Sequence, residues 1–107
     1  MPISFRVEIG VNAKHDVQSI HDYIARDKKR AAAKWVREFY RYARSLRQLP
    51  FRYEIIPEAE DMGTPYRHLF HGNYRIIYLV DEEQRKVSVV RVLHAGRILK
   101  RSFFRSL

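Results

Sequence analysis

The 107-residue sequence contains no cysteine. Disulfide bonds and thiolate metal sites are therefore excluded, and the composition is typical of a protein of the reducing cytoplasm. No apolar run approaches the roughly 20 residues that a membrane-spanning helix needs, so we expect no membrane partner. Arg6 and Glu8 lie where a signal peptide would have its apolar core, and export is not expected. The sequence also lacks a glycine-rich phosphate loop, and we expect no cofactor.

Acidic residues are scarce as well. The chain has 12 Asp and Glu against 21 Lys and Arg, which gives a formal net charge of +9 and a pI near 10.2. Residues 85–107 hold seven basic side chains and no acidic one, whereas residues 51–84 hold three and seven. This balance predicts an acidic or polyanionic partner, the alternative being that the charge only keeps the protein in solution.

The first half of the chain predicts one strand and two helices. Apolar residues alternate with polar ones over residues 3–9, which indicates a strand with one buried face. Asn12 is expected to cap a helix whose apolar stripe ends in the charged cluster 26–30. A second helix is expected from Arg30 to Leu49, ended by Pro50. Its apolar face is made by Trp35, Phe39, Tyr42, Leu46 and Leu49.

The opposite side of this second helix is basic. Five positive residues repeat on it at helical spacing: Arg30, Lys34, Arg37, Arg41 and Arg44. Like charges one turn apart repel each other, and a plain solvated face would usually interleave glutamates. Both a solvated face and a binding face fit this pattern.

The second half predicts three consecutive strands, Tyr66–Phe70, Tyr74–Val80 and Lys86–Leu93, after an irregular segment over 51–64. The element order is therefore β-α-α-β-β-β over one domain, residues 1–107. We expect an α+β fold with a helical hairpin on a mostly antiparallel sheet. Residues 96–104 are expected to form a short C-terminal helix or a strand-like tail.

Several local patterns, in this order and spacing, resemble the RelE/ParE superfamily of toxins from type II toxin–antitoxin modules. They are Asp16–Ile24, Ala31–Trp35, Ser45-Leu46 through Leu49-Pro50, Tyr74–Tyr78, Val92–His94 and Arg97. The resemblance covers nearly the whole chain. It implies a growth-arresting toxin that is neutralised by a cognate antitoxin.

The RelE-like branch of the superfamily implies an enzyme, a ribosome-dependent mRNA endoribonuclease. Attack of a ribose 2′-OH on the adjacent phosphate needs a proton acceptor, cations around the phosphorus and an acid for the leaving oxygen. The candidates here are Arg67, Arg75, His94 and Arg97, with Arg91, His68 and Tyr78 as further ones. Structural alternatives are an ion pair of Arg75 with Glu58 or Asp61, a capping or core role for His94 and core packing for Tyr78.

The ParE-like branch implies a binding protein that poisons DNA gyrase and needs no catalytic residue. RelE-like toxins commonly carry Tyr, His or Lys in a reactive C-terminal segment. The last ten residues here, ILKRSFFRSL, contain Lys100, Arg101 and Arg105 but neither Tyr nor His. This departure favours the ParE-like branch. A third alternative is an inactive relative that serves only as an interaction module.

The resemblance also implies a protein partner. An acidic antitoxin segment is expected along the helical hairpin and the basic sheet surface, as is a homodimer or a toxin–antitoxin hetero-oligomer. The predicted partner-binding residues are Arg30, Lys34, Arg37, Arg41, Arg44, Arg91, Lys100 and Arg101. No metal site is expected, because the odd spacing of His68 and His71 in a strand places them on opposite faces.

Overall fold

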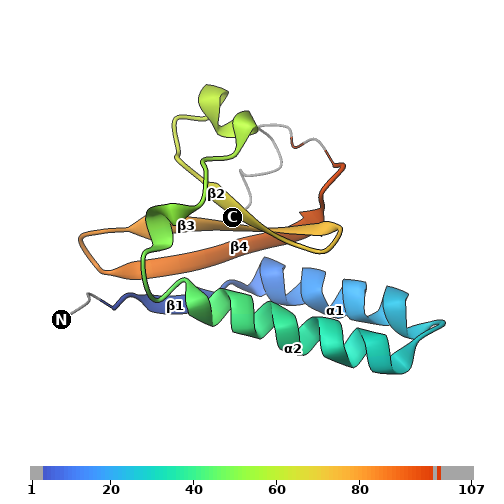
Figure 1. Ribbon diagram of the computed structural model, residues 1–107. Helices are drawn as coiled ribbons and strands as arrows, with labels where there is room; N and C mark the ends of the chain where they lie inside the picture. The colour runs from blue at the N-terminus through green and yellow to red at the C-terminus, as the bar shows by residue number, and fades with distance from the viewer. Residues whose placement is uncertain (1–3, 98, 100–107) are drawn as a thin grey trace.

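The computed structural model describes residues 4–97 and 99 and has two main layers, a helical hairpin and a four-stranded sheet (Figure 1). The elements are β1 (Arg6–Ile9), α1 (Val11–Ala25), α2 (Lys29–Ser45), β2 (Arg67–His71), β3 (Tyr74–Asp81) and β4 (Lys86–His94). The predicted β-α-α-β-β-β order is confirmed. Most of the segment predicted as a C-terminal helix or strand-like tail, residues 96–104 with Lys100 and Arg101, lies outside the described residues. No helix in the described part is long and apolar enough to cross a membrane.

The sheet has the strand order β1-β4-β3-β2. β1 runs parallel to β4, with Arg6 opposite Lys86, and the other two pairings are antiparallel. The mostly antiparallel sheet is therefore confirmed. The β2–β3 turn uses the positive φ of Gly72, 59°, which glycine adopts without a steric penalty.

The main core lies between the hairpin and the sheet. Trp35 and Phe39 from the apolar face of α2 pack with Leu69, Ile76 and Tyr78 of the sheet. Burying each such side chain contributes about 1.5–3 kcal/mol to folding. The prediction that Trp35 belongs to the core is confirmed.

A second, smaller core covers the other face of the sheet. Its buried members are Ile56, Ala59, Ile77, Leu93 and Leu99. The cover comes from the segment predicted to be irregular, which contains two short 3-10 helices, η1 (Pro50–Arg52) and η2 (Pro57–Asp61). Each begins at a proline, whose fixed φ suits the first helical position. The sheet face opposite the hairpin is therefore partly covered by protein, although the arginines in the strands would also suit a face that is open to water.

Two predicted helix boundaries are wrong. α1 begins at Val11 with Gly10 as its N-cap, because Gly10 ends the pairing with β4 and its carbonyl accepts the first helical hydrogen bond, from Lys14. α2 ends at Ser45. Pro50 disfavours a helical conformation at the preceding residue, and Leu49 has a φ of 49° and is 75% exposed. Leu49 therefore does not belong to the apolar face of α2.

Candidate functional site

Arg75 lies on β3 with its side chain on the sheet face opposite the hairpin, and it is only 4% exposed. Its guanidinium donates to both carboxylate oxygens of Glu58 in η2, with Nη1 3.2 Å from Oε1 and Nη2 2.5 Å from Oε2. Nη2 also donates to the carbonyl of Arg97 at 2.8 Å. The chain itself therefore supplies the anion that this buried arginine requires.

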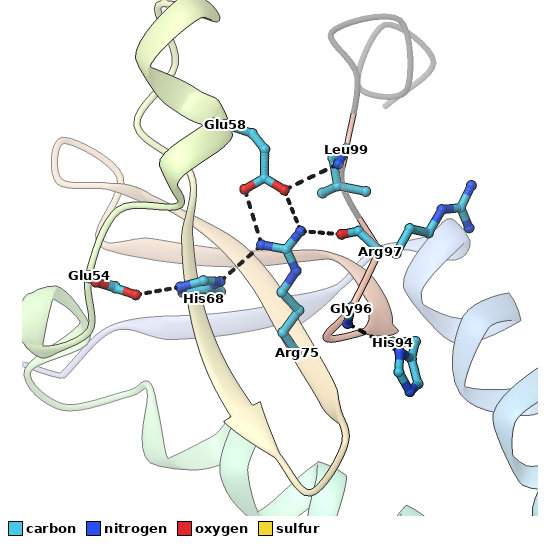
Figure 2. Close-up of polar contacts among 8 residues, drawn as sticks. All are labelled: Glu54, Glu58, His68, Arg75, His94, Gly96, Arg97 and Leu99. Atoms are coloured by element: carbon cyan, nitrogen blue, oxygen red, sulfur yellow. Dashed lines mark hydrogen bonds and ion pairs between the residues drawn. The ribbon is translucent and has the colours of Figure 1, made fainter.

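Glu58 and His68 extend this contact into a network (Figure 2). Glu58 Oε2 also accepts the Leu99 N–H at 3.2 Å. The hydrogen bonds from Arg75 lower the pKa of Glu58 to about 2, so its carboxylate is charged at neutral pH. His68 Nδ1 accepts from Arg75 at 3.2 Å, which leaves Nε2 to donate to Glu54 at 2.9 Å. The network fastens η2 and the end of the described chain onto the sheet.

Arg91, on β4, meets Asp16 of α1. Its Nε and Nη2 donate to the two carboxylate oxygens at 2.6 and 2.8 Å, and Asp16 also accepts the backbone N–H of Val92 at 2.9 Å. Both side chains are less than a fifth exposed. The charge of Arg91, which we predicted to face a partner, is thus compensated within the chain.

Arg67 and Tyr78 are cross-strand neighbours that hold the segment after α2. Arg67 Nη1 donates to the carbonyls of Tyr53 at 2.6 Å and Phe51 at 3.3 Å. The fully buried Tyr78 donates its hydroxyl to the Pro50 carbonyl at 2.6 Å. Burial raises the pKa of Tyr78 to about 12, so this phenol is a poor proton donor near neutral pH. Tyr78 packs in the main core.

The candidate nuclease side chains are not all brought together: Arg75 meets His68, but His94 lies apart from both. His94 is the cross-strand neighbour of Tyr74, on the hairpin side of the sheet, while Arg75 points to the opposite side. His94 is exposed, and its Nδ1 accepts the Gly96 N–H at 3.1 Å. Figure 2 shows the ring of His94 and the guanidinium of Arg97 pointing away from Arg75. Arg75 and His68 do meet, but within the described residues their hydrogen bonds go to Glu58, to Glu54 and to each other. His94 does not join them, so this cluster does not offer a free base, cation and acid around a reacting phosphate.

His68 and His71 do face opposite sides of the sheet. His71 stacks on Trp35, with ring centres 5.0 Å apart, and its Nε2 donates to the Trp35 carbonyl at 3.0 Å. His68 belongs to the Arg75 network on the other face. Among residues 4–97 and 99, no three His, Cys, Asp or Glu side chains are grouped so that they could hold a metal ion.

The predicted basic residues of α2 form one exposed surface, the α2 basic face: Arg30, Lys34, Arg37, Arg41 and Arg44. Lys34 is 3.8 Å from Glu38. The four arginines make no ion pair with any residue in the described part of the chain. A shallow hollow of about 400 Å³ on this face is lined by Lys34, Arg37, Glu38, Arg41 and Arg44.

An apolar groove of about 650 Å³ was not predicted from the sequence. It is lined by Phe5, Gln48, Leu49, Pro50, Phe51, Glu82, Glu83 and Arg85. Leu49 and Phe51 are 75% and 44% exposed there. The one signal in the sequence was Pro50, which ends helical structure before it and so turns Leu49 out of the core.

Comparisons with known proteins agree with this architecture. The family model described as the ParE toxin of a type II toxin–antitoxin system, parDE, matches residues 7–99. A search of curated protein sequences found no significant match.

Three solved structures with the same fold come from toxin–antitoxin systems. A chain of the chromosomal ParDE system from P. aeruginosa superposes with a TM-score of 0.71 at 14% identity, covering 87% of this chain and 98% of that one. The RelBE2 complex from Mycobacterium tuberculosis gives 0.62 at 21% identity, covering 88% and 95%. The archaeal RelE–RelB complex from Pyrococcus horikoshii gives 0.62 at 21%, covering 89% and 99%. At these identities the likeness shows a common fold.

Proposed function

Because the chain belongs to the ParE toxin family of type II toxin–antitoxin systems, we propose that it arrests growth by binding and poisoning DNA gyrase. This activity would depend on binding to gyrase and not on catalysis by the toxin. The toxin would trap gyrase on its cleaved DNA and would need no catalytic residue of its own.

One observation carries this choice over mRNA cleavage. The side chains that cleavage would require lie on opposite sheet faces or are already engaged in the described part of the chain. Arg75 is bonded to Glu58, and Tyr78 is bonded to the Pro50 carbonyl with a pKa of about 12. His94 lies on the face away from Arg75. A phosphoryl-transfer site needs these groups held around one point.

We further propose that a cognate antitoxin neutralises the protein. The solved structures that share its fold include toxin–antitoxin complexes, in which a second chain accompanies the toxin. The formal charge of +9 favours an antitoxin with an acidic segment, since opposite charges speed association.

Two assays with the purified protein separate gyrase from the ribosome as the target. The first measures gyrase supercoiling of a relaxed plasmid, and we expect inhibition with accumulation of cleaved DNA. The second reads mRNA on translating ribosomes by primer extension, and we expect no codon-phased cuts. Codon-phased cuts that disappear in His94→Ala, together with unaffected gyrase, would instead establish a ribosome-dependent nuclease.

The choice of variant matters in these assays. His94 is exposed at the end of β4, so His94→Ala leaves the core intact. Arg75→Ala would leave Glu58 as a charge without its partner, and its loss of activity would report on folding. No effect on gyrase, ribosomes or cell growth would identify the chain as an inactive interaction module.

A further inference from the structure

We propose that the α2 basic face binds the phosphate backbone of duplex DNA. The inference goes beyond the proposed function, and it stands or falls independently of whether gyrase is the target. It rests on the geometry, the uncompensated charge and the chemical make-up of this face.

The face is a straight row of charges on a rigid element. Its five members follow one another at spacings of four and three residues, which keeps them within an arc of about 80° around the helix axis. From Arg30 to Arg44 the row is about 21 Å long. Trp35 and Phe39, on the opposite side of α2, pack in the main core, so the row lies on the side of α2 that faces away from the sheet. An extended polyanion could therefore contact all five side chains at once.

The charge of the row is almost entirely uncompensated. Lys34 lies 3.8 Å from the carboxylate of Glu38. The other four members, which are Arg30, Arg37, Arg41 and Arg44, have no carboxylate partner among the described residues. Neighbouring like charges one turn apart cost a few tenths of a kcal/mol each. Guanidinium groups donate two parallel hydrogen bonds, which match the oxygens of a phosphate. A backbone of regularly spaced phosphates would relieve the repulsion along the whole row.

An acidic antitoxin segment, which we predicted for this face from the sequence, fits it less well. The central part of a protein–protein interface is depleted in charge and is anchored by apolar or aromatic side chains. All five residues that line the hollow on this face are charged. Protein–DNA interfaces, in contrast, are strongly basic and polar.

The residue composition of the α2 basic face also favours duplex DNA over single-stranded nucleic acid. Proteins that bind single-stranded nucleic acid stack its bases on aromatic side chains. The row itself contains only Arg and Lys, and Tyr40, which is 38% exposed within one turn of Arg37 and Arg44, adds one aromatic ring beside it. The face can therefore hold a line of phosphates but is not built to stack a run of bases. The major groove of B-form DNA, about 12 Å wide, admits an α-helix, whereas that of A-form RNA is too narrow.

The test is the salt dependence of binding to a fluorescent 20-base-pair duplex, measured by anisotropy between about 50 and 200 mM salt. The variant Arg37→Gln/Arg41→Gln/Arg44→Gln removes three charges from the face. The matched control Lys14→Gln/Arg26→Gln/Arg85→Asn removes three exposed charges elsewhere, with Asn at 85 because φ is 51° there. Circular dichroism verifies that both variants remain folded.

We expect wild-type affinity to fall with salt with a logarithmic slope of about −4.5, since each of five phosphate contacts contributes about −0.9. The triple variant of the α2 basic face should lose at least tenfold in affinity at the lowest salt and nearly three units of slope. The control should keep the wild-type slope. Equal losses in both variants would mean general charge attraction and would overturn the proposal.

Binding measurements with two further ligands, an acidic peptide and an RNA duplex, test the other possible partners of this face. If an acidic polyglutamate peptide binds through the same three arginines and the duplex does not bind, the face is a peptide surface and the proposal is wrong. An A-form RNA duplex that binds more tightly than DNA would also overturn it. The gyrase assay is read separately, so a negative result there leaves the DNA measurement interpretable.

Discussion

Arg75 was a candidate catalytic residue in the sequence, but its contacts give it a structural role. A guanidinium that is 4% exposed is costly unless most of its donors are satisfied. Here Glu58, the Arg97 carbonyl and His68 accept from its two terminal nitrogens, while the buried Nε has no hydrogen-bond partner among the described residues. The sequence left two partners open for this arginine, a substrate phosphate or a carboxylate such as Glu58 or Asp61, because both anions satisfy the same donors. The structure shows the ion pair with Glu58.

The pairing of Glu58 with Arg75 makes stability depend on pH. The pKa of Glu58 is lowered from 4.5 to about 2. Its contribution, about 1–3 kcal/mol, is therefore complete above pH 4.5 and is lost as the pH falls from about 4.5 toward 2. Glu58→Gln should lower the free energy of unfolding at pH 7 and should lack this part of the acid dependence, as measured by urea denaturation at several pH values.

Glu60→Gln is the matched control for this measurement, since Glu60 is an exposed carboxylate of the same 3-10 helix. It should reproduce the pH profile of the wild type. A Glu58→Gln profile parallel to that of the wild type between pH 2 and 5 would show that the ion pair does not stabilise the fold.

β4 contains an irregularity in its pairing with β3, and the alternation of buried and exposed residues in a regular strand could not predict its position. Ile77 is opposite Arg91 and Tyr78 is opposite Val89, so Val90 is an extra residue on β4. Val89 and Val92, three positions apart, would face opposite sides of a regular strand, yet both belong to the main core. The extra residue restores the register.

Asp16 stabilises the part of β4 that follows this irregularity. β1 pairs with β4 only as far as Val89. Beyond it, the carboxylate of Asp16 accepts the Val92 N–H and both bonds from Arg91. Asp16→Asn should lower the free energy of unfolding by about 1–3 kcal/mol, because it leaves Arg91 partly unpaired. Hydrogen exchange at the Val92 amide should become faster, which NMR can measure.

Asp22→Asn provides the comparison, since Asp22 is an exposed residue of the same helix that bonds only to Gln18 and His21. Its effect on stability should be much smaller, and exchange at Val92 should be unchanged. If the two variants behave alike, Asp16 has no particular role at the edge of β4.

Most elements were predictable because their signals are local. Apolar periodicity predicted both helices and the first strand, and Pro50 marked the end of helical structure. The β-branched and aromatic residues between turns predicted the other three strands. The contacts that build the site were not predictable in this way. Asp16 and Arg91 are 75 positions apart, and no local pattern in the sequence links them. Such pairs exist only once the sheet and hairpin have assembled.

At the scale of the whole molecule, the fold depends on contact between the two ends of the chain. β1 has one neighbour in the sheet, β4, and Arg6 lies opposite Lys86. A fragment of residues 1–84 should therefore not fold, since it lacks the central partner of both β1 and β3. Circular dichroism and NMR amide dispersion would check this expectation.

A fragment of residues 1–99 is the control, because it keeps the described strand pairings and the Leu99 contact with Glu58. It should give dispersed amide signals and unfold cooperatively. A cooperative transition in the 1–84 fragment would show instead that the hairpin and β2–β3 form an independent unit.

The parallel pairing of β1 with β4 also has a consequence for synthesis. The first strand emerges from the ribosome long before its partner, so the sheet is completed only when residue 94 has been made. At about 5–20 residues per second, this interval is about 5–20 seconds. A nascent toxin of this topology should therefore lack its completed sheet, and with it its toxicity, for nearly its whole translation. A nonsense mutation before codon 86 should abolish toxicity completely.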